Sequence, residues 1–409
     1  MNEASWRYPG WRVVLACFAA AIFSWGFGFY GHSVFLAELR GLYGWPASLI
    51  AGATTMYYLL GAFLVIFISD AIARLGPRRL LLAGTACLAA AMLLLAFVRT
   101  PWQLCIAYIV MSFGWAGMSL GAITNILGLW FDARRGMAIS LALNGASFGG
   151  IIGAPALVFV IGALGFRSGV IAAAAVLIAI MVPTALLCVG RPPGARQAMP
   201  GNASGARPAP RWTRAMALKS LAFWTISGPF ALALLAQVGF LVHLVSILEP
   251  HLGRPQAGVA ISVMSVMAVA GRVGLGTIID RLNQRLVTAV SLVSQAIALA
   301  LMVRISDPTA LFLLCSLFGL SVGNIITLPS LLIQREFDSA AFGLLIGLST
   351  AINQFAYSLG PGLLGLVRDL TGGYAAALML CIALELTAAA VILRRPAAAS
   401  RLSRAADPR

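Results

Sequence analysis

The segment ISVMSVMAVAGRVGLGTII, residues Ile261–Ile279, is apolar over the length of a membrane-spanning helix and contains one charged residue, Arg272. A helix needs about 20 predominantly apolar residues to cross a bilayer. The guanidinium of Arg272 stays charged at physiological pH, and burying it in a bilayer costs at least roughly 2.5–3.5 kcal/mol. A residue with that cost normally faces a water-filled cavity or a partner group. Arg272 is therefore predicted to mark a path for a substrate or an ion.

Apolar segments of this kind recur along the whole chain. Of its 409 residues, 61% are hydrophobic and 10% are charged, whereas soluble globular domains carry about 25% charged residues. Twelve segments are long enough to span a bilayer, at residues 12–37, 47–69, 80–98, 102–130, 137–162, 168–190, 221–248, 256–279, 286–304, 309–333, 341–367 and 374–393. The composition therefore predicts an all-α, polytopic membrane protein.

The net charge of +16 would suit a protein that binds nucleic acid, but the distribution of the charge excludes that class. Of the 28 lysines and arginines, Arg272 lies inside a span and six occupy alternate loops, one to a loop: Arg40, Arg99, Arg167, Arg254, Arg304 and Arg368. The remaining 21 lie in the opposite set of loops and near the two ends of the chain. Because loops rich in Lys and Arg stay in the cytoplasm, both termini are predicted to be cytoplasmic.

The chain is predicted to consist of two similar halves. Residues Arg191–Lys219, between the sixth and seventh segments, are rich in Pro, Gly, Ala and Arg, which is typical of a flexible linker. His32 and Glu38 recur 211 residues later as His243 and Glu249, and Gly44-Trp45-Pro46 recurs as Gly253-Arg254-Pro255. Ordered matches near one offset indicate an internal duplication.

The predicted architecture follows from this duplication. Twelve transmembrane helices form two pseudo-symmetric six-helix bundles, an N-terminal one at residues 1–190 and a C-terminal one at 220–394. A cytoplasmic linker at 191–219 joins them, and residues 395–409 form a cytoplasmic tail.

No metal and no cofactor is expected. The six cysteines lie at scattered depths inside apolar segments, in a spacing that suits neither a metal site nor an outward disulfide. Met264 and Met267 share a helix face, and thioethers suit Cu(I). No Met or Cys cluster accompanies them in the seventh segment, so packing is the preferred interpretation.

Two loops resemble a signature of the major facilitator superfamily of membrane transporters. Residues 276–285, GTIIDRLNQR, resemble its Gly-x3-Asp-Arg motif after the eighth span. The counterpart after the second span keeps the aspartate, but the following arginine is displaced by about one helical turn. The resemblance implies two six-helix bundles that alternate in access. It assigns conformational gating to Asp70, Arg74, Asp280, Arg281 and Arg285.

A narrower set of motifs resembles the monocarboxylate-porter branch and the related oxalate/formate exchangers. These motifs are Gly10-Trp11, LYGWP at 42–46, RLGPR at 74–78, WFDARRGMA at 130–138 and NGASFGG at 144–150. Members carry an arginine in the eighth span that meets the substrate carboxylate, and Arg272 falls in that place. The sequence departs from them in two respects. Ala268 replaces the acid often found one turn before this arginine, and the eleventh segment has no lysine.

Arg272 is accordingly interpreted as a carboxylate clamp. Its planar fork of donors matches the two oxygens of a carboxylate, and one fixed positive charge suits a mono-anion better than a dianion. The duplicated position in the second span is Ala62, so the arginine is not part of the repeated scaffold. The alternative is a structural bridge from Arg272 to an acid or to backbone carbonyls of another helix.

Polar residues of the first and seventh spans are candidates for substrate binding and proton coupling. His32 and His243 would change charge near neutral pH, and the resemblance implies that their helices line a central cavity. Tyr30, beside His32, adds a hydroxyl donor, while Glu38 and Glu249 are candidates for proton entry or an outer gate. The alternatives are histidines bonded across helices, a tyrosine that only packs, and acids solvated at helix ends.

Two amides and three glycines complete the predicted site. Asn125 in the fourth span and Asn353 in the eleventh are candidates for substrate binding, because an amide in an apolar helix lines a cavity or ties helices together. Gly145, Gly149 and Gly153 recur every four residues and predict a close-packing face. Helices are expected to slide along this face during gating.

These features predict a secondary active transporter, not an enzyme, since no nucleophile–base pair or metal constellation is visible. It is expected to move a small organic anion, preferably a monocarboxylate, with proton coupling and by alternating access. The alternative is uptake or efflux of a larger neutral or aromatic compound, a vitamin or a drug, with Arg272 structural. A receptor is disfavoured because the linker and tail are too short for a signalling domain.

The expected location is the inner membrane of a bacterium, because a single lysine among 28 basic residues is typical of a GC-rich genome. The expected partners are the small-molecule substrate, protons and the lipid bilayer. No nucleic acid is expected, and the sequence makes no prediction about the oligomeric state.

Overall fold

The computed structural model describes residues 3, 5, 8–190, 212–337 and 341–394, without the side chains of residues 280 and 326. Most of the predicted linker and the predicted tail beyond residue 394 lie outside these ranges. Every regular element in the described part is helical, and twelve spans there are long and apolar enough to cross a membrane. The prediction of an all-α membrane protein with twelve spans is confirmed.

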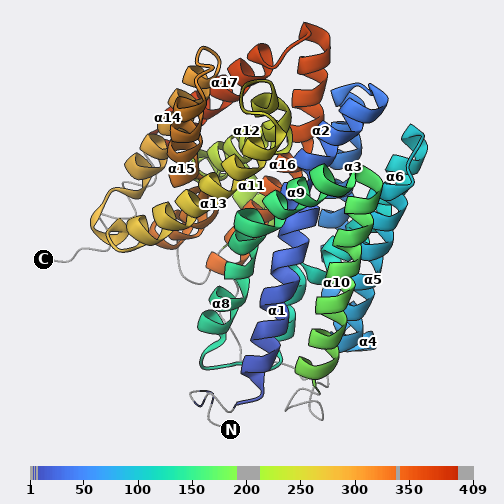
Figure 1. Ribbon diagram of the computed structural model, residues 1–409. Coiled ribbons are helices and arrows are strands. Elements are labelled where there is room, and N and C mark those ends of the chain that lie inside the picture. Colours follow the sequence, from blue (N-terminus) through green and yellow to red (C-terminus); the bar gives the residue numbers. More distant parts are fainter. Residues whose placement is uncertain (1–2, 4, 6–7, 191–211, 338–340, 395–409) are drawn as a thin grey trace, which may run out of the picture. The chain divides into compact units, whose positions relative to one another are not determined.

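The first six spans begin with α1 (Gly10–Trp25), the π-helix η1 (Gly26–Tyr30) and α2 (Gly31–Tyr43), which together form one continuous span (Figure 1). The elements that follow are α3 (Ala47–Val65), α4 (Ile68–Leu75), α5 (Pro77–Ala96), α6 (Pro101–Met118), α7 (Leu120–Gly128), α8 (Arg135–Phe148), the π-helix η2 (Gly149–Gly153), α9 (Ala154–Leu164) and α10 (Phe166–Cys188). The α6–α7 pair forms the fourth span, and α8, η2 and α9 form the fifth.

The later elements are α11 (Arg214–Lys219), α12 (Leu221–Leu252), α13 (Arg254–Gly276), the short 3-10 turn η3 (Ile279–Arg281), α14 (Gln284–Met302), α15 (Pro308–Glu336), α16 (Phe342–Thr371) and α17 (Ala375–Ile392). The helix α11 falls within the predicted linker, where Thr213 caps it by accepting a hydrogen bond from the Met216 amide at 3.2 Å. The C-terminal end of the predicted linker is therefore helical.

The duplicated Gly-x-Pro motif forms the same turn in both halves of the sequence. Gly44 ends α2 and Gly253 follows α12, with φ angles of 66° and 74°. Only glycine adopts this left-handed conformation without steric cost, and proline two residues later cannot continue the preceding helix. The motif therefore fixes where the first and seventh spans end.

The chain packs as two compact units. Unit 1 comprises Met1–Ala203 with Val242–Ser265, and unit 2 comprises Ser204–Leu241 with Val266–Arg409. The end of α12 and the beginning of α13 thus pack with the N-terminal spans. The two units are defined by which residues pack together, and not by position along the chain. The predicted boundaries of the two six-helix bundles therefore remain a prediction.

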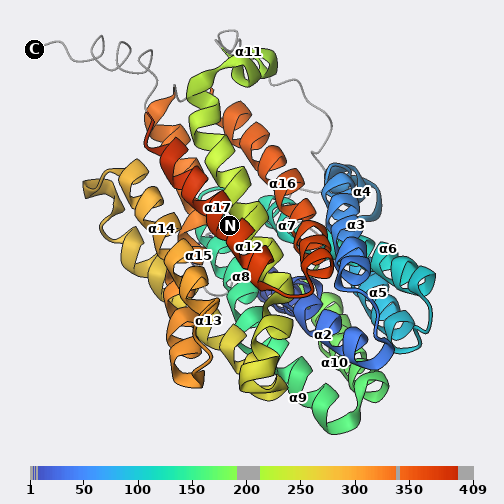
Figure 2. The same ribbon diagram turned by 90° about the horizontal axis from the view of Figure 1, so that it is seen from above.

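In unit 1, α5 packs against α6 and α10, α3 packs against α6, and α1 packs against α8. Figures 1 and 2 both show α3, α5 and α6 side by side. Glycines bring the backbones close where α5 and α6 cross. A Cβ on Gly114 would lie 2.8 Å from the Leu88 nitrogen. Small residues of this kind drive helix association in membranes.

In unit 2, α14 packs against both α15 and α17, and Figure 2 shows these three helices together. A cluster of buried apolar side chains from α12, α14, α15 and α16 fills its interior, including Phe223, Phe230, Leu292, Ile325 and Leu345. Large apolar side chains also stay exposed on both units. In a protein with twelve membrane-length helices, exposed apolar side chains suit a surface that contacts lipid.

Candidate functional site

Arg272 lies half-buried on α13, where its Nε donates a hydrogen bond to the carbonyl oxygen of Gly323 on α15 at 3.3 Å. The two helices touch through their backbones at this point. A Cβ on Gly271 would collide with the Leu320 carbonyl oxygen, and one on Gly323 would collide with that of Ala268. The close crossing brings the guanidinium of Arg272 against α15 and fixes its direction.

The same unit contains a buried amide that sequence reasoning selected, Asn353 on α16. Its Oδ1 has no hydrogen-bond partner in the described part of the chain. One turn earlier, Ser349 accepts a hydrogen bond from Ser227 of α12 at 3.0 Å. Buried polar atoms are nearly always bonded to protein or water. The orphaned carbonyl of Asn353 therefore has the capacity to bind a donor from a ligand or a water.

His32 lies at the start of α2 and is fully buried among three tyrosines, Tyr57, Tyr58 and Tyr108. The centroid of its ring lies 4.5 Å from that of Tyr57, 5.6 Å from Tyr58 and 4.9 Å from Tyr108. Neither ring nitrogen has a hydrogen-bond partner among the described residues. In this conformation the imidazole has no access to solvent. The three tyrosines would have to move before His32 could make its predicted contact with a substrate.

His243 and Tyr30 also lie in unit 1. His243 is fully buried on α12, two residues before Val245, whose backbone amide donates to Ser33 Oγ of α2 at 2.8 Å. Tyr30 ends η1 and is half-buried, with its ring 5.2 Å from that of Phe29. A Cβ on Gly150 would lie 2.7 Å from the Tyr30 ring, so this ring rests on η2. Their predicted substrate and proton roles stay predictions.

Glu38 and Glu249, the duplicated acids, share one arginine. Arg254, the first residue of α13, bonds Glu38 Oε2 at 2.8 Å through Nη1 and Glu249 Oε1 at 2.6 Å through Nη2. The Glu38 side chain is 6% exposed and that of Arg254 is 31% exposed. This cluster ties the end of α2 to the α12–α13 turn.

Sequence reasoning treated Arg254 only as a charge on a loop and missed its role in this cluster. A signal was present in the duplication, because Arg254 takes the place of Trp45 in the repeated Gly-x-Pro motif. An arginine in the second half of the chain where the first half has a tryptophan indicates an interaction that the first half does not share. Arg254 is therefore added to the candidate gating residues.

The predicted glycine face of the fifth span packs against the first span, and both spans turn into π-helices there. A Cβ on Gly149 would lie 2.6 Å from the Ile22 oxygen, one on Gly153 would lie 3.0 Å from the Gly26 Cα, and one on Gly145 would collide with the Phe18 oxygen. The first span has η1 at this level and the fifth has η2. Such π-turns occur frequently at functional sites.

Each π-helix presents a backbone carbonyl to a neighbouring side chain. Tyr57 of α3 donates its hydroxyl to the Gly28 oxygen at 2.7 Å, and Ser262 of α13 donates to the Ile151 oxygen at 2.6 Å. These side-chain hydrogen bonds give donors to backbone carbonyls in the two segments where the α-helical hydrogen-bond pattern is interrupted. The glycine face is thus closely packed as expected, whereas sliding of helices along it stays a prediction.

The loop motifs assigned to gating behave differently in the two units. In unit 1, Asp70 and Arg74 are exposed on α4, and neither side chain has a hydrogen bond or ion pair among the described residues. Asn125 of α7 instead accepts a hydrogen bond from Ser69 of α4 at 3.1 Å. Asn125 therefore ties α7 to α4 in this conformation.

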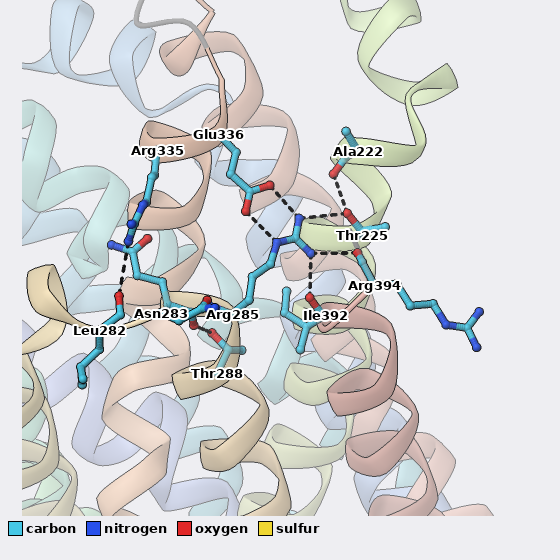
Figure 3. A network of polar contacts seen from close by, with 11 residues as sticks. Ala222, Thr225, Leu282, Asn283, Arg285, Thr288, Arg335, Glu336, Ile392 and Arg394 are labelled. Carbon is cyan, nitrogen blue, oxygen red and sulfur yellow. Dashed lines mark hydrogen bonds and ion pairs between the residues drawn. The ribbon is translucent and has the colours of Figure 1, made fainter. Parts of the chain in front are cut away.

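In unit 2, Arg285 forms a buried network that Figure 3 shows at close range. Its Nε and Nη2 bond the two oxygens of Glu336 at 2.6 and 2.7 Å. Nη2 also donates to Thr225 Oγ1 at 3.1 Å, and Nη1 donates to the carbonyl oxygens of Ile392 and Arg394 at 2.7 and 3.2 Å. One guanidinium thereby joins the ends of α12, α14, α15 and α17.

Glu336 and Thr225 were not selected from the sequence, because nothing in their spacing connects them with Arg285. Arg281 is exposed four residues earlier, and the side chain of Asp280 lies outside the described residues. Of the two gating arginines predicted in this loop, Arg285 has the more extensive contacts.

The N-terminal end of the chain binds the loop between α7 and α8. The Glu3 carboxylate accepts hydrogen bonds from the backbone amides of Asp132 and Arg134 at 2.9 and 2.8 Å, which lowers the pKa of Glu3. Tyr8 donates its hydroxyl to the Trp130 carbonyl oxygen, and its ring packs edge-on against Phe131 at 5.3 Å. The WFDARRGMA motif is therefore a docking point for the N-terminal segment.

A family model described as "Major Facilitator Superfamily" matches residues 14–361 and 247–408. Among curated relatives, the MFS-type transporter pynF of Aspergillus niger is 28% identical over 67% of this chain and 62% of its own length, so the match spans less than two thirds of it. Monocarboxylate transporter 13 of Bos taurus is 24% identical over 95% of this chain and 89% of its own. The uncharacterized MFS-type transporter YcxA of Bacillus subtilis is 23% identical over 91% of both chains.

Solved structures show the same fold. The crystal structure of the nucleoside transporter NupG superposes with a TM-score of 0.74, at 15% identity over 94% of this chain and 99% of that one. An inward-facing bacterial homologue of the human lysosomal transporter Spinster gives 0.73, at 13% identity over 97% and 98% of the two chains.

Proposed function

The chain belongs to the major facilitator superfamily, and on that premise we propose that it is a proton-coupled secondary transporter of a small monocarboxylate. Membrane transport of a small molecule is the activity of the family and of its similar relatives. The choice of a monocarboxylate depends on a single observation. A permanently charged guanidinium, Arg272, lies on a membrane-length helix, about one turn from its C-terminal end, against the backbone of α15.

Three facts support the carboxylate over other substrates. No acidic residue occurs in α13, so this helix supplies no counter-charge for Arg272. A guanidinium is costly to hold at membrane depth, and its planar fork of donors matches the two oxygens of a substrate carboxylate. Finally, monocarboxylate transporter 13 aligns with nearly the whole chain.

The mechanism that fits these residues is alternating access between two conformations. The Arg254 cluster with Glu38 and Glu249 would be the gate on the side away from the cytoplasm, closed in this structure. Release of Arg254 from its two acids would precede opening. His32 and His243 would carry the coupling proton, because an imidazole binds a proton near neutral pH. We place the transporter in a bacterial inner membrane with both termini in the cytoplasm.

The test is uptake of labelled monocarboxylates into proteoliposomes, with and without an inward proton gradient. The variants are Arg272→Ala and Arg272→Lys, with Arg304→Ala as the matched control, because Arg304 is an exposed loop arginine. Saturable uptake that rises with the gradient, is lost in Arg272→Ala and is unchanged in Arg304→Ala would support the proposal. Lysine should restore uptake only in part, because a point charge lacks the planar fork.

Absence of uptake of every acid by folded wild-type protein would refute the monocarboxylate. Equal uptake by wild type and Arg272→Ala would instead assign Arg272 a structural role, as its bond to the Gly323 carbonyl permits. The alternative substrate, a larger neutral or aromatic compound, would then be tested with the same vesicles.

A further inference from the structure

A cavity of about 340 Å³ lies in unit 1 where α2, α5 and α9 end and α10 begins, and none of its lining residues belongs to the proposed transport site. Its lining includes Tyr43 from α2, Phe97 and Arg99 from the turn after α5, and Arg167 with Ser168 from the start of α10. The sequence places the two arginines on separate loops, one to each. The structure brings them to a single cavity.

The electrostatics of this cavity favour an anion. Its lining holds two guanidinium groups and no acidic residue. Arg167 is held in place by the Phe97 ring, with its Cζ 4.2 Å from the ring centroid. The first turn of α10 also belongs to the lining, and Gly165 before it has no side chain to cap the backbone amides. The positive end of this 23-residue helix adds to the two arginines.

The rim of the cavity is apolar and exposed. Leu42 is 53% exposed and Leu164 is 56% exposed, and both are the kind of residue that soluble surfaces avoid. Tyr43 stacks on Trp45 at 4.9 Å and donates its hydroxyl to the Val98 carbonyl oxygen at 2.6 Å. Aromatic residues of this type are enriched at the boundary between hydrocarbon and water.

We propose that this cavity binds the headgroup phosphate of an anionic phospholipid, with its acyl chains against the apolar rim. The two guanidinium groups and the α10 amides match a phosphate in charge and hydrogen bonding. A soluble phosphate would use the same donors but would make no contact with the two exposed leucines. A phospholipid would contact both the arginines and the apolar rim. This binding does not depend on which substrate the protein carries.

The test uses the full chain purified in detergent and a fluorescent short-chain phosphatidylglycerol as the probe. Competitors are unlabelled phosphatidylglycerol, phosphatidylcholine with the same chains, and inorganic phosphate. Arg99→Gln and Arg167→Gln are compared with Arg304→Gln, which removes one exposed loop arginine outside the cavity. The charge-preserving variants Arg99→Lys and Arg167→Lys separate loss of charge from loss of fold.

Phosphatidylglycerol should displace the probe at least tenfold better than phosphatidylcholine. Each glutamine variant should weaken binding roughly fivefold, because each basic residue near an anionic lipid raises the binding affinity by about that factor. Arg304→Gln should stay within about twofold of wild type, and the lysine variants should bind more tightly than the glutamine variants. Equal displacement by the two lipids, or glutamine variants that bind as wild type does, would overturn the proposal. Displacement by inorganic phosphate as effective as by phosphatidylglycerol would assign the cavity to a soluble anion.

Discussion

The Arg285 network offers a quantitative test of how unit 2 is held together at one end. Replacing Arg285 with alanine removes five hydrogen bonds to four partners at once. The Arg285 side chain is 3% exposed and that of Glu336 is 20% exposed. Breaking a buried ion pair by removal of one partner costs about 3–5 kcal/mol. Because Glu336 reaches water, its orphaned carboxylate is partly solvated, and we expect Arg285→Ala to cost about 2–4 kcal/mol.

Replacing Glu336 with alanine should cost a similar amount for a different reason. It leaves a cation buried, although Arg285 keeps the carbonyl oxygens of Ile392 and Arg394 as acceptors. In the double variant neither charge is orphaned, so its cost should fall short of the sum of the single costs by at least about 1 kcal/mol.

The assay is equilibrium unfolding in mixed SDS micelles, followed by circular dichroism. Arg281→Ala is the matched control, because Arg281 lies four residues earlier and is exposed. It should change the free energy of unfolding by less than about 0.5 kcal/mol. Single costs that add within about 0.5 kcal/mol would refute the inference that the pair acts as a unit. A cost for Arg281→Ala equal to that for Arg285→Ala would show that charge alone, and not the network, stabilises this end.

Three further outcomes follow from the described contacts. Arg254→Gln should release the two acids that Arg254 bridges. A cysteine introduced at the buried position Ser33 should then react with maleimide several-fold more, as measured by site-resolved mass spectrometry. Unchanged labelling would exclude Arg254 as a gating residue. Gly149→Ala should lower both thermal stability and uptake, because its Cβ would meet the backbone of the first span, whereas Gly162→Ala, with nothing within 4 Å, should do neither; equal effects would contradict the close-packing role. The lowered pKa of Glu3 means that its contribution is present above its ordinary pKa of 4.5 and is lost as the pH falls below that value through the folded pKa. Proteolysis of the N-terminal segment should therefore increase on acidification in wild type and be independent of pH in Glu3→Gln.

The number and approximate positions of the spans were predictable because they depend on local sequence. Hydrophobicity over about 20 residues decides which segments cross a bilayer, and each of the twelve predicted segments overlaps one of the twelve candidate spans, although several ends differ by a few residues. The duplication correctly picked out Gly44 and Gly253 as equivalent positions, since a glycine with positive φ leaves a recognisable sequence mark.

The contacts between distant residues were not predictable in the same way. The pairing of Arg285 with Glu336 spans 51 residues and needs α14 and α15 to be placed against each other. The shared bonding of Glu38 and Glu249 to Arg254 likewise depends on packing, although the duplication related the two acids. His32 was selected for its chemistry, but only the structure reveals the tyrosines that enclose it.

The π-helix η1 changes which face of the first span each later residue occupies. An α-helix advances about 100° per residue, and a π-turn accommodates one additional residue without lengthening the helix by a full step. Every residue from Gly31 to Tyr43 is therefore out of phase by about that angle with a helical wheel drawn from Gly10. Deleting one residue from Gly26–Tyr30 would restore the α-helical phase and rotate His32 and Glu38 away from their present neighbours. In this protein, the angular register of the first span depends on a single inserted residue.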